Sequence, residues 1–397
     1  MRPTASAVII GGGCMGASLA YHLARRGLTD VVLLEREALL GTASTGRNAG
    51  GVRHQFSHEA NIRLSIESIA LFERFEEVVG TPIDFRQDGY LFLLSSEASV
   101  TEFKTSVGRQ RRLGVEVAWL APDEAVALAP GLDTTGVIAA TFCAKDGIAD
   151  PNGVTMGFAK AAQAAGVEMC RETEAIGIDV HGGRVVGVRT TRGRIDTPIV
   201  VNAAGAWAGQ VGTLAGLGVP VRPLRRHIFI AHPPGPEGWT RKRADGSPEL
   251  VAPSSRIMVI DFETSFYFHR EGANLLFGMG DPHEAYGFDT TVRWDLLPDV
   301  VEAAVARLPI LADTAISHAW AGLYEVTPDA MPVIGRATAL DGFYCLAGFS
   351  GHGFQHSPAA GRVLADVITG HDPAFDLSPF ALERFAAGSS TGEGHFV

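Results

Sequence analysis

Residues 7–16 have the sequence AVIIGGGCMG, which is the strongest indication of fold in the chain. The first four residues are apolar and predict a short buried strand of a parallel sheet. Gly11, Gly13 and Gly16 follow with the spacing GxGxxG, which permits a tight turn, close approach of the backbone to a pyrophosphate, and close packing of helix on strand. A helix predicted over residues 16–26 would direct its free N–H groups at the phosphates.

The next residues complete a strand–helix–strand unit and add an acid. Val31–Leu34 predicts a second strand, and Glu35 at its end is placed to accept hydrogen bonds from an adenosine ribose 2′-hydroxyl. Glu35 argues against NADP, because a 2′-phosphate would meet a like charge there. The motif does not distinguish NAD from FAD. A glycine-rich turn beside a surface glutamate is the alternative that the motif leaves open.

The composition is typical of a globular enzyme with two domains. The chain has 397 residues, of which 46% are hydrophobic and 19% charged, so it is too long for one core and too apolar to be disordered. Its net charge of −11 argues against nucleic acid as a partner. The four cysteines lack CxxC spacing, so neither a disulfide framework nor a metal site is expected. Without a signal-type N-terminus or a long apolar run, we expect a cytoplasmic protein with no transmembrane segment.

Hydrophobic periodicity predicts the other elements. Helices are expected at residues 60–79, 154–165, 297–308 and 357–369, and a hairpin at residues 184–195. Residues 232–255 are rich in proline, glycine and charge, which predicts either an active-site lid or a mobile surface loop. Residues 387–397 are polar and are expected to form a flexible tail.

Four sequence blocks identify a family. They are residues 41–53 (GTASTGRNAGGVR), 200–207 (VVNAAGAW), 324–329 (YEVTPD) and 348–354 (GFSGHGF). With these blocks the chain resembles the D-amino-acid-oxidase superfamily, and most of all the sarcosine oxidase β-subunit and related amine and amino-acid dehydrogenases. The resemblance implies an α/β fold, in which a Rossmann-type FAD-binding domain is interleaved with an antiparallel-sheet substrate domain. It places the FAD-binding domain at residues 1–85, 146–222 and 320–386, and the substrate domain at residues 86–145 and 223–319.

The resemblance also implies that FAD is the cofactor and that it binds non-covalently. Monomeric sarcosine oxidases attach the flavin to a cysteine just before the tyrosine block, where this chain has Gly322. The small residues 44–51 can offer N–H groups to a phosphate. The helix expected from residue 357, with Pro358 in its first turn, would face the flavin edge that becomes anionic on reduction. The expected cofactor-binding residues are Gly11, Gly13, Cys14, Met15, Gly16, Glu35, Arg36, Ser44, Thr45, Arg47, Asn48, Ala49, Gly50, Gly51, Ala175, Ala204, Gly205, Trp207, Gly322, Gly351, His352, Gly353, Phe354 and Gln355.

Five residues are candidates for contact with the substrate. Arg53 matches a family arginine and could hold a carboxylate bidentately, the alternative being a surface ion pair. His54 and His269 could titrate near neutral pH and help to present a neutral amine, although a lone histidine is more often structural. Tyr324 aligns with a family tyrosine near the substrate. Gln355 stands where sarcosine oxidases have a lysine that assists carboxylate binding, so another cation or a different substrate is expected.

These residues predict an enzyme that oxidises a small amine or amino acid, either an N-methyl or a D- or L-amino acid. A hydride would pass to flavin N5, and the resulting imine would hydrolyse. The oxygen-activating lysine of the oxidases is replaced by Leu276, which favours a dehydrogenase. The acceptor could be O2, a quinone or a partner protein, and the chain could form homo- or hetero-oligomers. Oxidation of a 2-hydroxy acid, and a role as the flavin subunit of a larger dehydrogenase, are the alternatives.

Overall fold

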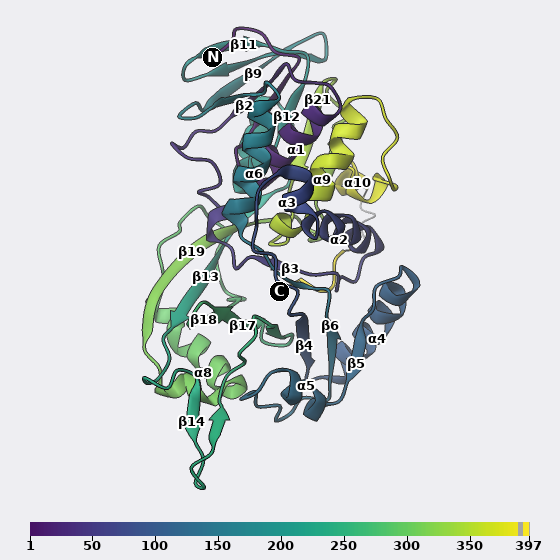
Figure 1. Ribbon diagram of the computed structural model, residues 1–397. Coiled ribbons are helices and arrows are strands. Elements are labelled where there is room, and N and C mark those ends of the chain that lie inside the picture. Colours follow the sequence, from purple (N-terminus) through teal and green to yellow (C-terminus); the bar gives the residue numbers. More distant parts are fainter. Residues whose placement is uncertain (388–391, 397) are drawn as a thin grey trace.

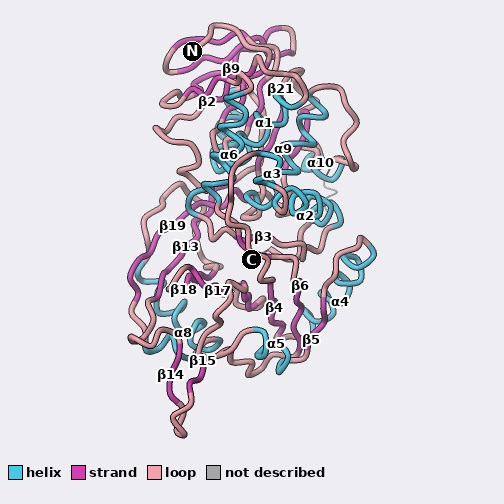
Figure 2. The backbone as a smooth tube through the Cα atoms, viewed as in Figure 1, coloured by secondary structure: helices cyan, strands magenta, loops and turns pink. Residues whose placement is uncertain are grey.

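The computed structural model describes residues 1–387 and 392–396. The chain forms two large sheets, one in the upper and one in the lower half of the molecule (Figure 1). Figure 2 shows most of the helices beside the upper sheet. The described C-terminal residues lie near the centre, where the two halves meet.

The upper sheet is the Rossmann-type unit expected from the glycine motif, and the fold class is confirmed. Its strands are parallel except at the β20–β21 pair. β1, β2 and β12 are buried throughout, because helices cover one face and a small sheet and a helix cover the other. The strand order is β20 (Val333–Arg336), β21 (Phe343–Ala347), β12 (Val200–Asn202), β1 (Ala7–Ile10), β2 (Val31–Leu34) and β8 (Glu168–Cys170).

Three helices pack together over one face of this sheet: α1 (Cys14–Arg25), α6 (Pro151–Ala164) and α9 (Gly353–Ile368). Two further helices, α2 (Glu59–Phe72) and α3 (Phe75–Val79), extend this layer. The opposite face is covered by α7 (Ala208–Leu214) and by the antiparallel strands β9 (Ala175–His181), β10 (Arg184–Thr190) and β11 (Gly193–Asp196).

The lower sheet is antiparallel except between β16 and β4. Its strand order is β19 (Ile316–Val326), β13 (Arg222–Ala231), β18 (Asn274–Met279), β17 (Phe266–Glu271), β16 (Met258–Asp261), β4 (Tyr90–Leu94), β6 (Ala139–Cys143) and β5 (Ala118–Leu120). Its helices are α4 (Glu97–Arg112), α5 (Pro122–Leu128) and α8 (Leu297–Arg307). The long strands β13 and β19 reach up to the Rossmann unit (Figure 1).

The remaining elements are β3 (Gly51–Val52), β7 (Gly147–Ile148), β14 (Thr240–Lys242), β15 (Pro248–Leu250), α10 (Arg384–Ala387), and the short 3-10 helices η1 (Thr45–Arg47), η2 (Gly205–Trp207), η3 (Trp294–Leu296), η4 (Pro309–Asp313) and η5 (Ser378–Phe380).

The structure differs from the sequence-based expectations in four places. The helix expected over residues 60–79 is two helices, α2 and α3. α9 begins at Gly353 and not near residue 357, so Pro358 lies inside the helix and not in its first turn. Residues 232–255 contain the β14–β15 hairpin. Residues 392–396 are not frayed: Glu393 is 6% exposed and His395 is 0% exposed, whereas residues 388–391 and 397 of the expected tail lie outside the described residues.

Candidate active site

A first cavity lies at the C-terminal ends of β1, β2 and β12, around the glycine motif. Its volume is about 410 Å³, within the range of ligand and cofactor sites. Gly11 has φ of 118°, and a Cβ there would overlap the carbonyl oxygen of Ala203. A Cβ at Gly16 would overlap the carbonyl oxygen of Gly11. Both positions therefore require glycine, as the motif predicted, because backbones meet there.

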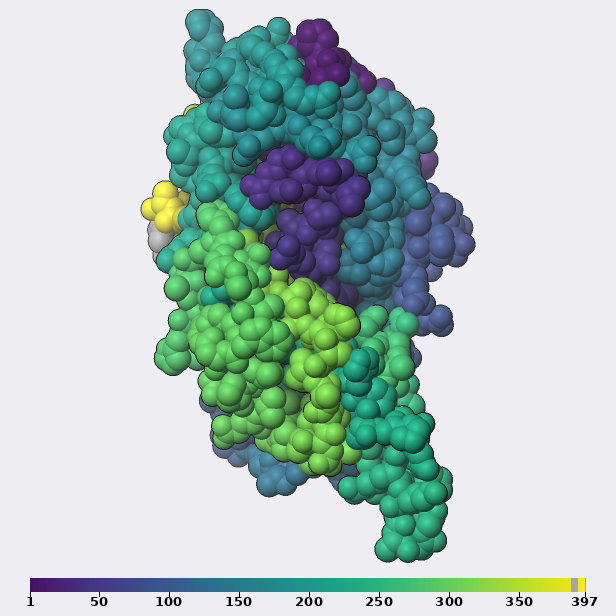
Figure 3. All heavy atoms as spheres, turned by 90° about the vertical axis from the view of Figure 1, so that its left-hand side faces the viewer, coloured from purple at the N-terminus to yellow at the C-terminus, as the bar shows by residue number. Residues whose placement is uncertain are grey.

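The acid that follows β2 is fixed at this cavity. Glu35 accepts hydrogen bonds from the backbone N–H groups of Gly12 and Glu37, both at 2.9 Å. The hydroxyl of Thr45 accepts a bond from the N–H of Cys14 at 3.2 Å, which ties the loop after β2 to the start of α1. These bonds hold the loop and the helix end together on one side of the cavity. In Figure 3 the purple segment after β2 forms the surface between the teal upper part and the green lower part.

The expected cofactor residues divide between two cavities. The first is lined by Gly11, Gly13, Cys14, Met15, Glu35, Arg36, Ser44, Thr45, Ala175, Ala204, Gly205 and Trp207. The second is lined by Ser44, Arg47, Asn48, Ala49, Gly51, Gly322, Gly351, His352, Phe354 and Gln355. Ser44 belongs to both, so the cavities adjoin. Three residues, Gly16, Gly50 and Gly353, line neither cavity and instead pack closely against neighbouring atoms.

The second cavity is built on the lower sheet and the start of α9, and its volume is about 120 Å³. Tyr90, Tyr267 and Tyr324 contribute three phenol rings from β4, β17 and β19. Burial raises the pKa of each phenol, so all three remain neutral hydrogen-bonding groups near neutral pH. The lining therefore suits a small ligand that presents both apolar and polar atoms.

Arg53 lines this cavity as expected, but its guanidinium already has partners. It donates to the carbonyl oxygen of Gln55 and, at 2.7 Å, to the carbonyl oxygen of His395. Its backbone N–H donates to Oε1 of Gln355 at 2.7 Å, and its Cζ lies 3.9 Å from the centre of the Phe56 ring. Burial lowers its pKa. The orientation of Arg53 is therefore fixed by the protein.

Arg226 is a third arginine in the lining of this cavity, besides Arg47 and Arg53, and the sequence analysis did not identify it. Its Cζ lies 5.1 Å from the centre of the Tyr324 ring, and its Nη1 donates a long bond of 3.3 Å to the carbonyl oxygen of Arg225. Its Nε has no hydrogen-bond partner, and within the described ranges no carboxylate pairs with it. The two-residue period of a strand could have indicated that Arg226 faces the cavity, because Arg226, Ile228 and Ile230 lie on one face of β13.

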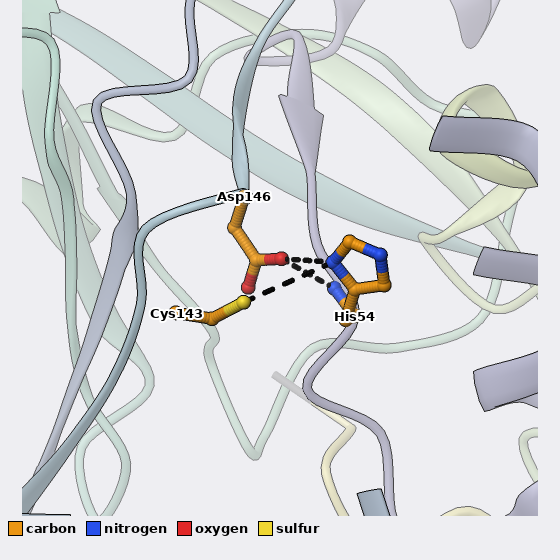
Figure 4. A group of neighbouring side chains, drawn as sticks. All are labelled: His54, Cys143 and Asp146. Carbon is orange, nitrogen blue, oxygen red and sulfur yellow. Dashed lines mark hydrogen bonds and ion pairs between the residues drawn. The ribbon is translucent and has the colours of Figure 1, made fainter. Parts of the chain in front are cut away.

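His54 lies outside both cavities and binds an aspartate instead (Figure 4). Its Nδ1 lies 2.7 Å from Oδ1 of Asp146, and its backbone N–H donates to the same oxygen at 2.8 Å. Gln55 donates to the other oxygen of Asp146 at 3.2 Å, and the Sγ of Cys143 lies 3.9 Å from the imidazole. This network positions the segment that carries Arg53 and does not place the imidazole against the second cavity.

His269 also lies outside the cavity lining. It is 1% exposed, its Nδ1 lies 2.8 Å from the carbonyl oxygen of Arg270, and burial lowers its pKa to about 4. Leu276, on the adjacent strand β18, packs with Ile228 and Ile230. The position expected for an oxygen-activating lysine is thus part of an apolar cluster.

Strand β19 contributes to both cavities: Gly322, Leu323 and Tyr324 line the second, and Glu325 lines the first. Tyr324 lines the second cavity, and a Cβ at Gly351, where φ is 92°, would overlap its ring. Glu325 lines the first cavity and accepts a bond from the N–H of Gly348 at 3.0 Å. The sequence analysis also missed Glu325, although its place beside Tyr324 on a strand implies the opposite face.

The buried carboxyl of Glu325 predicts an unusual pH dependence. Burial raises its pKa from 4.5 to about 7. Because the folded chain then binds the proton more tightly than the unfolded chain, this contribution to stability is complete below about pH 4.5 and is lost as the pH rises to about 7. The unfolding free energy of Glu325→Gln should therefore rise relative to that of the wild type by on the order of 2–3 kcal/mol between pH 5 and pH 8. Urea unfolding of the FAD-free proteins measures this difference. Glu116→Gln, at an exposed position, is the control. If the difference in unfolding free energy between Glu325→Gln and wild type does not change with pH, the raised pKa of Glu325 is contradicted.

Comparisons with known proteins agree with this geometry. A family model described as DAO, FAD dependent oxidoreductase, matches residues 6–367. The chain is 33% identical to FAD-dependent oxidoreductase domain-containing protein 1 of Bos taurus, covering 97% of this chain and 86% of that protein. It is 32% identical to the mitochondrial dimethylglycine dehydrogenase of Rattus norvegicus, covering 98% of this chain but only 46% of that protein.

Among solved structures, the L-proline dehydrogenase of P. horikoshii aligns with a TM-score of 0.87 and 34% identity, covering 98% of this chain and 100% of that one. The glycine oxidase of Geobacillus kaustophilus aligns with a TM-score of 0.82 and 25% identity, covering 96% and 99%. Among the residues that the structure describes, every helix is too short or too polar to span a lipid bilayer.

Proposed function

Because the chain belongs to the DAO family of FAD-dependent oxidoreductases, and because several similar proteins are named for amine or amino-acid substrates, we propose that its substrate is a small amine that carries a carboxylate. One observation carries this proposal. A dinucleotide-type cavity adjoins a small cavity lined by three arginines, Arg47, Arg53 and Arg226, none of which has a carboxylate partner among the described residues. Guanidinium groups without a carboxylate counter-ion in a partly buried cavity favour an anionic ligand.

The residues around the first cavity fit FAD. The backbone approaches at Gly11 and Gly16 leave no room for side chains, and α1 begins without a side-chain cap from Gly13. Such a helix start can accept a phosphate. Glu35 is placed for a ribose hydroxyl. Since Gly322 offers no thiol, we propose that FAD binds non-covalently.

When bound, FAD would supply the two-electron oxidation by taking a hydride from the substrate carbon. The protein would bind the substrate carboxylate with Arg226, and Arg53 would add a second positive charge whose position is fixed. The neutral phenols of Tyr90, Tyr267 and Tyr324 would surround the amine and limit access of water. With both reactants held in adjoining cavities, the substrate carbon is oriented for transfer before the reaction begins.

We further propose a dehydrogenase and not an efficient oxidase, because Leu276 packs in an apolar cluster with Ile228 and Ile230, and this position therefore does not supply the charge that a lysine would bring to the reduction of oxygen. The acceptor would then be a quinone or a partner protein. The L-proline dehydrogenase and the glycine oxidase are named for a secondary and a primary α-amino acid, so we propose that the substrate is a primary or secondary α-amino acid. Oxidation of a 2-hydroxy acid is less well supported, because neither His54 nor His269 lines the cavity. His352 does line it, but its Nδ1 and Nε2 lie 3.1 Å from His356 Nδ1 and from the carbonyl oxygen of Ala330, so both ring nitrogens are engaged by the protein.

The visible spectrum of the anaerobic protein tests this function. We expect flavin bands that bleach when an N-methyl, D- or L-amino acid is added and that recover slowly in air, because electron transfer to oxygen is unassisted. Recovery with an artificial quinone should be faster. If only a 2-hydroxy acid bleaches the flavin bands, the substrate is a hydroxy acid and the proposed amine is wrong. If the protein does not bind FAD, the proposed function is wrong as a whole.

A further inference from the structure

The C-terminal segment Gly392–Phe396, defined here as the closing segment, ends at the second cavity, which Phe396 lines. We propose that it forms a wall of the substrate site and that Phe396 sets the largest side chain that a substrate can have. The choice of a carboxylate as ligand rests on the proposed function. The position of the closing segment does not, because it follows from the contacts described below.

Glu393 anchors the closing segment to the upper half of the molecule. Its Oε1 accepts bonds of 2.7 Å from both the N–H and the hydroxyl of Ser57, and its Oε2 accepts a bond of 2.9 Å from the side chain of Asn61. Its own N–H donates to the carbonyl oxygen of Asp329 at 3.0 Å. A carboxylate that is 6% exposed needs this many donors to remain charged. The anchor is therefore a specific binding site for this residue and not an incidental surface contact.

His395 joins the closing segment to the lower half and to the cavity arginine. Its imidazole stacks on Phe103 of α4, with ring centres 3.9 Å apart and planes at 11°. Its carbonyl oxygen accepts the 2.7 Å bond from Arg53. The segment thus spans both halves of the molecule and occupies one donor of the arginine that the family resemblance assigned to the substrate.

Phe396 follows directly and lines the cavity together with Arg226 and Tyr324. Its ring centre lies 6.3 Å from that of Tyr324. The cavity measures only about 120 Å³ with this ring in place. A substrate with a bulky side chain would have to displace the phenylalanine, whereas a small amino acid would not. The wall therefore selects for small substrates by steric exclusion.

Binding of two carboxylates to the FAD-loaded protein tests the role of Phe396. Acetate and benzoate share the anionic group and differ by a phenyl ring, and both can be followed by perturbation of the flavin absorption bands. We expect Phe396→Ala to raise the affinity for benzoate relative to acetate by about tenfold or more, because the ring is removed from the wall. Phe375→Ala is the matched control, since Phe375 is also partly buried but does not line the cavity. An unchanged ratio in Phe396→Ala would overturn the proposal.

A second measurement tests the closing segment without relying on FAD or on activity. Hydrogen exchange of the FAD-free full chain should show protected amides at Gly394 and His395, which donate to Ser57 and to Glu393. Glu393→Ala should release this protection and leave α1 protected. Exchange of the wild-type segment at the rate of an unstructured peptide would overturn the proposal. If neither carboxylate binds to the wild type, the proposed carboxylate site fails, whereas the exchange result still decides whether the segment is docked.

Discussion

Gly16→Ala is expected to abolish retention of FAD. A Cβ at this position would overlap the carbonyl oxygen of Gly11, which is backbone and cannot rotate away. α1 would have to move off β1, and the N–H groups at its start would leave the positions that suit a phosphate. Overpacking of this kind costs roughly 1–3 kcal/mol in stability. Loss of the aligned donors should weaken FAD binding by roughly a hundredfold or more.

The matched control is Gly108→Ala in α4. Gly108 is also helical, but a Cβ there would meet only the Arg112 side chain, at 3.8 Å. We expect that variant to retain FAD and to gain roughly 0.5–1 kcal/mol in unfolding free energy, because alanine favours the helix. Flavin absorbance after gel filtration, with circular dichroism to check folding, measures both effects. A folded Gly16→Ala protein with full flavin content would show that the glycine serves only packing.

Arg226→Met should reduce kcat/KM for carboxylate substrates by roughly a hundredfold, since a charge-assisted bidentate contact is lost. Methionine keeps much of the side-chain volume, so the effect should come from the charge. Amines without a carboxylate should react at nearly the wild-type rate. Arg226→Lys keeps the positive charge but lacks the planar guanidinium, so it should recover only part of the lost kcat/KM.

Two other variants show whether the effect belongs to Arg226. Arg222→Met removes a cation from the same strand at an exposed position outside the cavity, and we expect it to behave like wild type. Arg53→Met should also raise KM for carboxylates more than for simple amines, but it should lower thermal stability as well, because its bonds to Gln55 and His395 are lost. An Arg226→Met enzyme that is impaired equally on both kinds of substrate would exclude the carboxylate role.

Much of the upper half of the molecule was predictable from local patterns. The glycines at 11 and 16, the acid at 35 and the apolar strands β1, β2 and β12 appear in the structure as expected, because each is required by contacts within one strand–helix–strand unit. The start of α9 was misplaced for a related reason. Pro358 is typical of a first helical turn, but tertiary packing of α9 against α1 overrides that preference.

The substrate cavity could not be predicted in this way, because its walls come from β4, β13, β16, β17, β19, the start of α9 and the closing segment, which are far apart in the chain. Local pattern placed a dinucleotide site at the N-terminus, since hydrophobic period and glycine spacing act over a few residues. Only the folded chain showed that Arg226 is unpaired, that His54 serves Asp146, and that Phe396 returns to the cavity. The partners of those side chains are set by long-range contacts, and no short stretch of sequence specifies them.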